Sequence, residues 1–115
     1  MASRERQAQM DKVYEQTLLY DFYGELLTER QKNICRMHLL EDWSLGEISE
    51  ELKISRQGVH DALRRGLEAL EEYEGKLHMV SRFLEVSRQL EELPGLAREG
   101  RLEEGIRSIR EALKQ

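Results

Sequence analysis

The 115-residue chain has one cysteine, one proline, few aromatic residues and no long apolar run. A lone cysteine, Cys35, cannot form an internal disulfide, and without a C-x-x-C pair it does not indicate a structural metal site. We interpret it as a small apolar residue in a reducing compartment. No eighteen apolar residues run together, so we expect no membrane insertion, and the polar N-terminus is not typical of a signal peptide. These absences predict a cytoplasmic protein.

Groups for catalysis and cofactor binding are also missing. No nucleophile, base and orienting acid cluster in the sequence, and no glycine-rich loop with a lysine is present to hold a nucleotide. The three histidines, His38, His60 and His78, do not share a helix at the spacing of metal ligands. We therefore predict no catalytic residues, no metal site and no cofactor, and a protein that is not an enzyme.

Charged residues make up 36% of the chain, and the formal net charge is -5. The two signs are not evenly spread. The stretch from Glu41 to Glu51 contains five acidic residues and no basic one, whereas the stretch from Lys53 to Arg65 contains four basic residues against Asp61 alone. Net acidity weakens long-range attraction to nucleic acid, but it leaves room for a local anion-binding site.

Helical periodicity runs through almost the whole chain and predicts an all-α fold. Residues 1–9 are polar and are expected to form a flexible N-terminus. The first helix should end near Gly24. Thr28-Glu-Arg-Gln31 and Ser44-Leu-Gly-Glu47 are capping boxes, in which a hydroxyl and a glutamine or glutamate side chain satisfy each other's backbone amides, so a helix should start after each. Ser55 is a further N-cap.

The stretch between the last two caps has the spacing of a helix-turn-helix. Its inward ladder takes two residues from a short helix, one from the turn and two from the next helix: Ile48, Leu52, Ile54, Val59 and Ala62. Lys53 occupies the turn position where glycine is commonest, which predicts a less sharp turn or a strained left-handed residue. The alternative is that two short helices simply pack into an all-α core with their charges solvated.

The C-terminal half carries apolar residues at helical spacing beyond the helix-turn-helix. We expect one long helix from Arg56 to about Glu92, kinked at Gly75, with a break at that glycine as the alternative. Leu93-Pro94-Gly95 is a stop signal. A final helix carries Leu102, Ile106, Ile109 and Leu113. The predicted organisation is a helix-turn-helix domain at residues 10–74 and a helical extension at residues 75–115 that packs on it or on a partner chain.

With the ladder inward, the start of the second motif helix must present polar groups outward. The candidate nucleic-acid-binding residues are Ser55, Arg56, Gln57, His60, Arg64 and Arg65. Arginine offers a fork of donors for phosphate or guanine, glutamine can pair with adenine, and the free amides after Ser55 attract a phosphate. Asp61 places a carboxylate among these donors. Tyr20, Phe22 and Tyr23 could stack on bases, but aromatic residues at helical spacing favour a core or interface role.

The segment LLTERQKNICRMHLLEDWSLGEISEELKISRQGVHDALRRGLEALEEYE resembles region 4 of bacterial sigma factors. More closely, YDFYGELLTERQ, the helix-turn-helix and EEYEGKLHMVSRF together resemble the YlxM-type family of helix-turn-helix proteins associated with the signal recognition particle. The resemblance covers about Val13 to Phe83. It implies a small bacterial regulatory protein in which Ser55, Arg56, Gln57, Val59 and His60 open the recognition helix, with DNA or signal recognition particle RNA as the ligand.

Three hypotheses follow. The first is a nucleic-acid-binding regulator that uses the second motif helix and takes part in the signal recognition particle pathway. The second is an adaptor that binds a basic partner, such as the particle's GTPase subunit, through Glu47, Glu50 and Glu51 without contacting nucleic acid. The third is a homodimer through the C-terminal helices, because their apolar stripes exceed what one small domain can cover.

Overall fold

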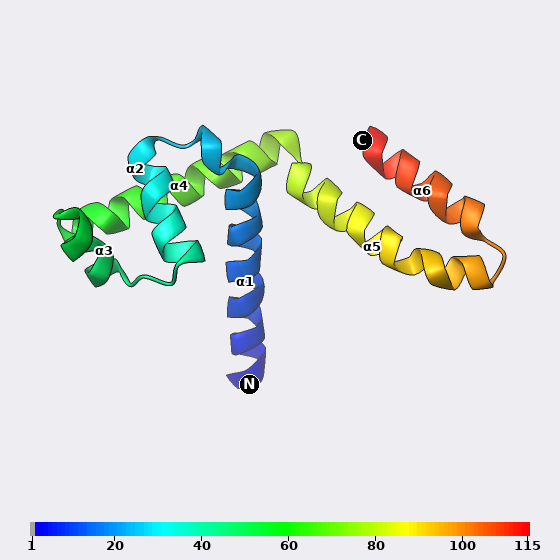
Figure 1. Ribbon diagram of the computed structural model, residues 1–115, viewed down its shortest axis with the longest axis horizontal. Helices are drawn as coiled ribbons and strands as arrows, with labels where there is room; N and C mark the ends of the chain where they lie inside the picture. Colours follow the sequence, from blue (N-terminus) through cyan, green and yellow to red (C-terminus); the bar gives the residue numbers. More distant parts are fainter. Residues whose placement is uncertain (1) are drawn as a thin grey trace. The chain divides into compact units, whose positions relative to one another are not determined.

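The computed structural model describes residues 2–115, and every regular element in that range is helical. Six α-helices follow one another in this part of the chain (Figure 1): α1 Ala2–Tyr23, α2 Glu29–Cys35, α3 Leu45–Leu52, α4 Arg56–Leu77, α5 Met79–Arg98 and α6 Leu102–Lys114. They form two compact units, residues 1–76 and residues 77–115. The all-α prediction is confirmed, and the division falls two residues after the expected boundary at 74.

The first helix is longer than the sequence pattern indicated. Residues 2–9, expected to form a flexible segment, are the first turns of α1, and the side chains from Ser3 to Glu15 are exposed. Figure 1 shows this half of α1 extending beyond the other helices of its unit. The helix ends at Tyr23 as predicted, and a single 3-10 turn at Gly24–Leu26 leads to the next helix.

Both predicted capping boxes are present. Thr28 Oγ1 accepts from the Gln31 amide at 3.2 Å while the Gln31 side chain accepts from the Thr28 amide at 3.3 Å. Ser44 and Glu47 exchange the same two hydrogen bonds at 3.1 and 2.9 Å. Local hydrogen bonding therefore starts α2 and α3 where the sequence places it. After Cys35, α2 continues as a π-helical turn at Arg36–Leu40.

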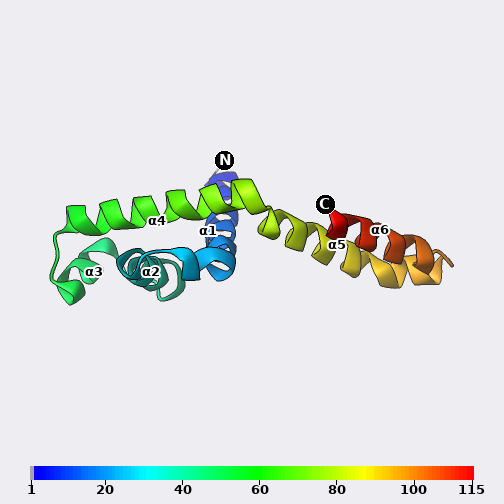
Figure 2. The same cartoon turned by 90° about the horizontal axis from the view of Figure 1, so that it is seen from above.

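The core of the first unit lies where α4 runs alongside α2 and α3, an arrangement visible from above in Figure 2. Side chains from all three helices are inaccessible to solvent there: Ile34, Cys35, Ile48, Val59 and Leu70. Gly66 lets α4 approach α2 closely, because a Cβ atom at this position would lie 2.8 Å from Cys35 Sγ. The core cysteine is buried, as the sequence predicted.

The expected long helix is interrupted at His78 instead of Gly75. His78 has a left-handed backbone, with φ 55° and ψ 28°, and separates α4 from α5. Gly75 is exposed and lies inside α4, where a glycine costs only about 1 kcal/mol relative to alanine. Histidine is among the residues enriched at positive φ, so the chain can turn here without a glycine.

The prediction that a helix ends at Leu93-Pro94-Gly95 was also wrong. Pro94 lies inside α5, which continues to Arg98. Two residues beyond this end, Gly100 has a φ of 73°, which permits a Schellman motif with Arg101 N donating to Leu96 O at 2.8 Å and Gly100 N to Ala97 O at 3.1 Å. Leu93 and Leu96, on either side of Pro94, both lie against Gly105 of α6.

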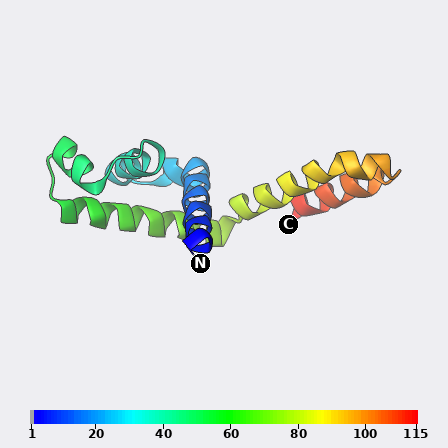
Figure 3. The same cartoon turned by 90° about the horizontal axis from the view of Figure 1, so that it is seen from below.

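The second unit is an antiparallel hairpin of α5 and α6, which lie side by side in both Figure 1 and Figure 3. Within residues 2–115, no helix is both long enough and apolar enough to cross a membrane.

Candidate nucleic-acid interface

The turn between α3 and α4 is held by backbone geometry and by one serine. Lys53 adopts the left-handed conformation, with φ 57° and ψ 44°, where glycine is the usual residue. Ile54 N donates to Ser49 O at 3.2 Å, and Ser49 Oγ donates to Ile54 O at 2.6 Å. These two hydrogen bonds between Ser49 and Ile54 join α3 to the turn.

Four of the five residues of the predicted inward ladder are buried or half-buried, but Leu52 is exposed. Ile48 and Val59 are fully buried and Ala62 is buried, while Ile54 is half-buried and Leu52 is 37% exposed. Leu52 therefore buries a smaller fraction of its side chain than Ile48 and Val59 do. This arrangement fixes α3 against α4 and determines which side of α4 faces solvent.

All six predicted nucleic-acid-binding residues are exposed: Ser55, Arg56, Gln57, His60, Arg64 and Arg65. They belong to the first three turns of α4 and its N-cap. Ser55 Oγ accepts from the Gly58 amide at 2.9 Å, so its hydroxyl caps the helix. The amides of Arg56 and Gln57 have no acceptor within the helix, because the first N–H groups of any α-helix lack one.

Several of these side chains engage neighbours on the same helix. Gln57 Nε2 donates to Asp61 Oδ1 at 3.1 Å, and His60 Nδ1 lies 3.8 Å from the same oxygen. Arg64 pairs with Glu68 at 3.0 Å. Such exposed i,i+4 pairs contribute only about 0.3–0.5 kcal/mol, so a phosphate can displace them at small cost. Asp61 thus organises two of the outward groups.

Arg56 and Arg65 differ from Arg64, because within residues 2–115 neither makes an ion pair. The Arg56 guanidinium lies over the first turn of α3, where a Cβ atom on Gly46 would approach one of its nitrogens to 3.0 Å. Gly46 therefore leaves room for Arg56 to rest there. No local sequence pattern predicts this contact, since it joins residues ten positions apart across the turn.

The predicted acidic partner surface on α3 is exposed, but its three members are not equivalent. Glu47 accepts the Ser44 amide in the capping box, and these hydrogen bonds with Ser44 lower the pKa of its carboxyl. Glu50 and Glu51 are exposed and form no ion pair in the described chain. A basic partner would therefore meet two available carboxylates, with the third already engaged in starting α3.

A model of one protein family matches residues 10–107, which is most of the chain. That family is UPF0122, described as "Putative helix-turn-helix protein, YlxM / p13 like". The chain belongs to the UPF0122 family. This membership confirms the resemblance to the YlxM-type family, and the helix-turn-helix observed at α3 and α4 agrees with the family description. UPF0122 is not a known enzyme family.

Related UPF0122 proteins come from several bacteria. One from Caldanaerobacter subterraneus subsp. tengcongensis is 56% identical over 67% of this chain, and one from Acetivibrio thermocellus is 57% identical over 66%. The chain spans 66% and 65% of the length of these two relatives, a little under two thirds. A relative from Oceanobacillus iheyensis is 42% identical over 89% of the chain and 97% of its own length.

The aromatic residues near the end of α1 in this UPF0122 protein lie against its other helices and do not form an open stacking surface. Tyr23 is buried, donates to Glu74 Oε1 at 2.6 Å and lies with its ring centroid 6.0 Å from that of Tyr73. Tyr20 donates to Lys32 O at 3.3 Å, and Phe22 is half-buried. The core interpretation is therefore confirmed for Tyr23, whereas Tyr20 and Phe22 are half-buried.

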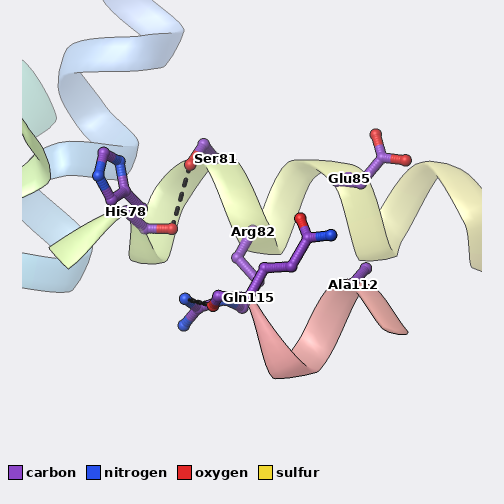
Figure 4. Close-up of a pocket in the computed structure, with 6 residues that line it drawn as sticks. All are labelled: His78, Ser81, Arg82, Glu85, Ala112 and Gln115. Carbon is purple, nitrogen blue, oxygen red and sulfur yellow. Dashed lines mark hydrogen bonds between the residues drawn. The ribbon is translucent and has the colours of Figure 1, made fainter. Parts of the chain in front are cut away.

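A hollow in the second unit brings a serine, a histidine and a glutamate close together, and Figure 4 shows how they lie. Ser81 Oγ donates to the backbone carbonyl of His78 at 3.1 Å, while the His78 ring points away from the hydroxyl. The Glu85 carboxylate is held by Arg88 and Gln89, which lower its pKa to about 2. The three side chains are therefore not arranged for nucleophilic catalysis.

Proposed function

We propose that this protein is a nucleic-acid-binding regulator that reads duplex DNA with the N-terminal turns of α4. The observation that carries the proposal is the exposure of three arginines, Gln57 and His60 on the first turns of α4, while Val59 and Ala62 of the ladder are buried. A helix presented in this way matches the docking of a helix-turn-helix, whose second helix enters the major groove with its N-terminal residues at the base edges. The capped N-terminus adds free amides that favour a phosphate.

The charges suit short-range contact more than long-range attraction. The first unit contains eleven basic and sixteen acidic residues, so the approach to DNA is not steered by net charge. Affinity must come from the local donors, Arg56 and Arg65 first, since Arg64 has to leave Glu68. A good bidentate base contact contributes about 1–3 kcal/mol of discrimination. We therefore expect moderate affinity that depends strongly on these few side chains.

A salt titration tests this proposal. Affinity for a pool of duplex DNA, followed by fluorescence anisotropy at several salt concentrations, should give a linear fall of log K with log salt, with a slope of about -0.9 per neutralised phosphate. Arg56→Ala and Arg65→Ala should each reduce the slope by about 1. Lys12→Ala, on the exposed part of α1, is the matched control and should leave it unchanged. A flat salt dependence for the unmodified protein would exclude the phosphate-contact mechanism.

Participation in the signal recognition particle pathway, supported by the sequence resemblance, is part of the same proposal. Particle RNA would bind differently, because the major groove of an A-form helix is too narrow for α4, and contacts would go to phosphates and unpaired loops. A parallel titration with a hairpin RNA distinguishes the two ligands. Tighter binding to the hairpin RNA than to every duplex would replace DNA with RNA as the target.

A second function is favoured by one observation: the exposed carboxylates of Glu50 and Glu51 have no ion-pair partner in the described residues of a chain with net charge -5. An adaptor role would use these groups to bind a basic protein, such as the GTPase subunit of the particle. A pulldown with that subunit decides between the functions. Binding that survives Arg56→Ala and Arg65→Ala but is lost in a Glu50→Lys/Glu51→Lys variant would select the adaptor.

A further inference from the structure

In the α5–α6 hairpin the two helices approach closely at Gly105, and an apolar face lies beside this contact. Where the helices are closest, a Cβ atom on Gly105 would lie 2.6 Å from Leu93 Cδ2 and 2.7 Å from Leu96 Cδ1, so any larger residue would force these leucine side chains to move. Ile109 and Ala112 of α6 are half-buried. Four large side chains are between 39% and 58% exposed nearby: Leu90, Leu102, Ile106 and Leu113.

Helical geometry places these exposed residues on one side of the hairpin. Leu90 lies three residues before Leu93, and Leu102 lies three residues before Gly105. Leu90 and Leu102 are therefore each rotated by about 60°, in the same sense, from a residue at this close contact, and Ile106 and Leu113 lie within about 40° of Leu102 around α6. Because α5 and α6 run antiparallel (Figure 3), equal rotations bring both stripes to the same side. The result is a continuous apolar face, which we define as Leu90, Leu102, Ile106 and Leu113.

The hairpin has few means of stability of its own. It comprises 39 residues, and the buried residues described in it are Val80 and Gly105. Units below about 40 residues generally need a disulfide, a metal or association with another chain. Cys35 is in the first unit, so the hairpin has no disulfide, and among residues 2–115 no group of three potential ligands is placed to hold a metal. Association is the means that remains.

Charge indicates which kind of partner covers the face. Residues 77–115 contain seven basic and seven acidic residues, so the hairpin is neutral, whereas residues 1–76 carry the entire net charge of -5. Two first units repel each other, but two hairpins do not, and net charge near zero favours association. A strongly basic or acidic partner would find no surplus of opposite charge on this unit. A second copy of the hairpin matches it in both apolar surface and charge.

We infer that the protein forms a homodimer in which the apolar faces of two hairpins pack together as a four-helix bundle. A two-fold axis makes such an interface self-complementary, with the same patch on each chain. Helix pairs of this kind pack at about 20° around a shared apolar core. The dimer joins two helix-turn-helix units, the arrangement that symmetric operators require, although the association itself does not depend on nucleic-acid binding.

Sedimentation equilibrium of the full chain tests the dimer. We expect the unmodified protein to be dimeric at concentrations on the order of 10 µM, and Leu113→Lys to shift the dissociation constant at least about tenfold toward monomer, a change of about 1.4 kcal/mol. The matched control is Glu111→Lys, which places a lysine two residues away on the polar side of α6 and should leave the dimer intact. Leu113 is 58% exposed, so its replacement should not prevent folding of the chain.

Thermal unfolding supplies a second measurement. The melting temperature of the unmodified protein should rise with protein concentration, as mass action requires for a dimer, and at equal concentration that of the Leu113→Lys variant should be lower. Three results would overturn the inference: a monomer at about 100 µM, a dimer equally sensitive to both substitutions, or a dimer lost on Val13→Lys in α1 but kept in Leu113→Lys. The last outcome would place the interface on the exposed half of α1.

Discussion

The contact between Gly66 of α4 and Cys35 of α2 allows a sharp test of how the first unit packs. Gly66→Ala adds one methyl group at a position where its carbon would lie 2.8 Å from Cys35 Sγ, against about 3.5–4.0 Å for a relaxed contact. Cys35 is fully buried, so its sulfur cannot move aside into solvent. The two helices must separate, or one side chain must leave its preferred rotamer.

The expected magnitude follows from two opposing effects. Alanine is favoured over glycine inside a helix by about 1 kcal/mol, and overpacking a core costs about 1–3 kcal/mol. The same helix contains Gly75, which is exposed and where an added methyl carbon would meet no neighbouring atom within 4 Å. Gly75→Ala should therefore raise the free energy of unfolding by up to about 1 kcal/mol, and Gly66→Ala should lie about 1–3 kcal/mol below it.

Urea unfolding measures this difference. Trp43 is the only tryptophan of the chain and belongs to the first unit, so its fluorescence reports on that unit. Replacing the cysteine as well, in Gly66→Ala/Cys35→Ala, should recover part of the stability lost in Gly66→Ala. The coupling free energy between the two substitutions should be about 1–2 kcal/mol. If Gly66→Ala proves as stable as Gly75→Ala, α4 does not approach α2 as closely as the structure shows. Additive single and double substitutions would refute the contact itself.

Three further predictions concern single residues. Lys53→Gly should raise the free energy of unfolding by about 1 kcal/mol in the same urea assay, because glycine adopts the left-handed turn without the cost that lysine incurs; an unchanged or lower value would contradict the turn geometry. Burial raises the pKa of the Cys35 thiol to about 11, so Ellman's reagent at pH 8 should label it slowly in the native protein and rapidly in urea. The free energy of unfolding that burial of the neutral thiol provides should decline as the pH rises from about 9 to 11. Fast labelling of the native protein would show that the thiol is accessible. Hydrogen bonds from Arg88 and Gln89 lower the pKa of Glu85 to about 2, so the stabilisation they give α5 is present above the ordinary pKa of 4.5 and is lost as the pH falls from about 4.5 to 2. Helicity measured by circular dichroism should fall over that range, and Glu85→Gln should lessen the fall. An identical acid transition in the unmodified protein and in Glu85→Gln would assign the transition to other carboxyl groups.

Much of the first unit could be predicted from the sequence because its helix caps and its apolar periodicity connect residues no more than four positions apart. The capping boxes at Thr28 and Ser44 and the cap at Ser55 each join a side chain to an amide three positions away. The ladder from Ile48 to Ala62 follows from helical periodicity. Once the inward residues of α4 are known, the exposed side must carry Arg56, Gln57 and His60. All-α structure and the place of the candidate interface were therefore determined by the sequence itself.

Only the tertiary structure decided where helices are interrupted and what the candidate side chains contact. Gly75 and Pro94 are the local signals for a break, yet α4 passes the glycine, which costs only about 1 kcal/mol inside a helix. α5 passes the proline, and Leu93 and Leu96 on either side of it lie against Gly105 of α6. The resting place of Arg56 over Gly46 and the closeness of Gly66 to Cys35 likewise join residues that are far apart along the chain. Such contacts depend on how helices are brought together in space, and the order of residues within any single helix does not contain that information.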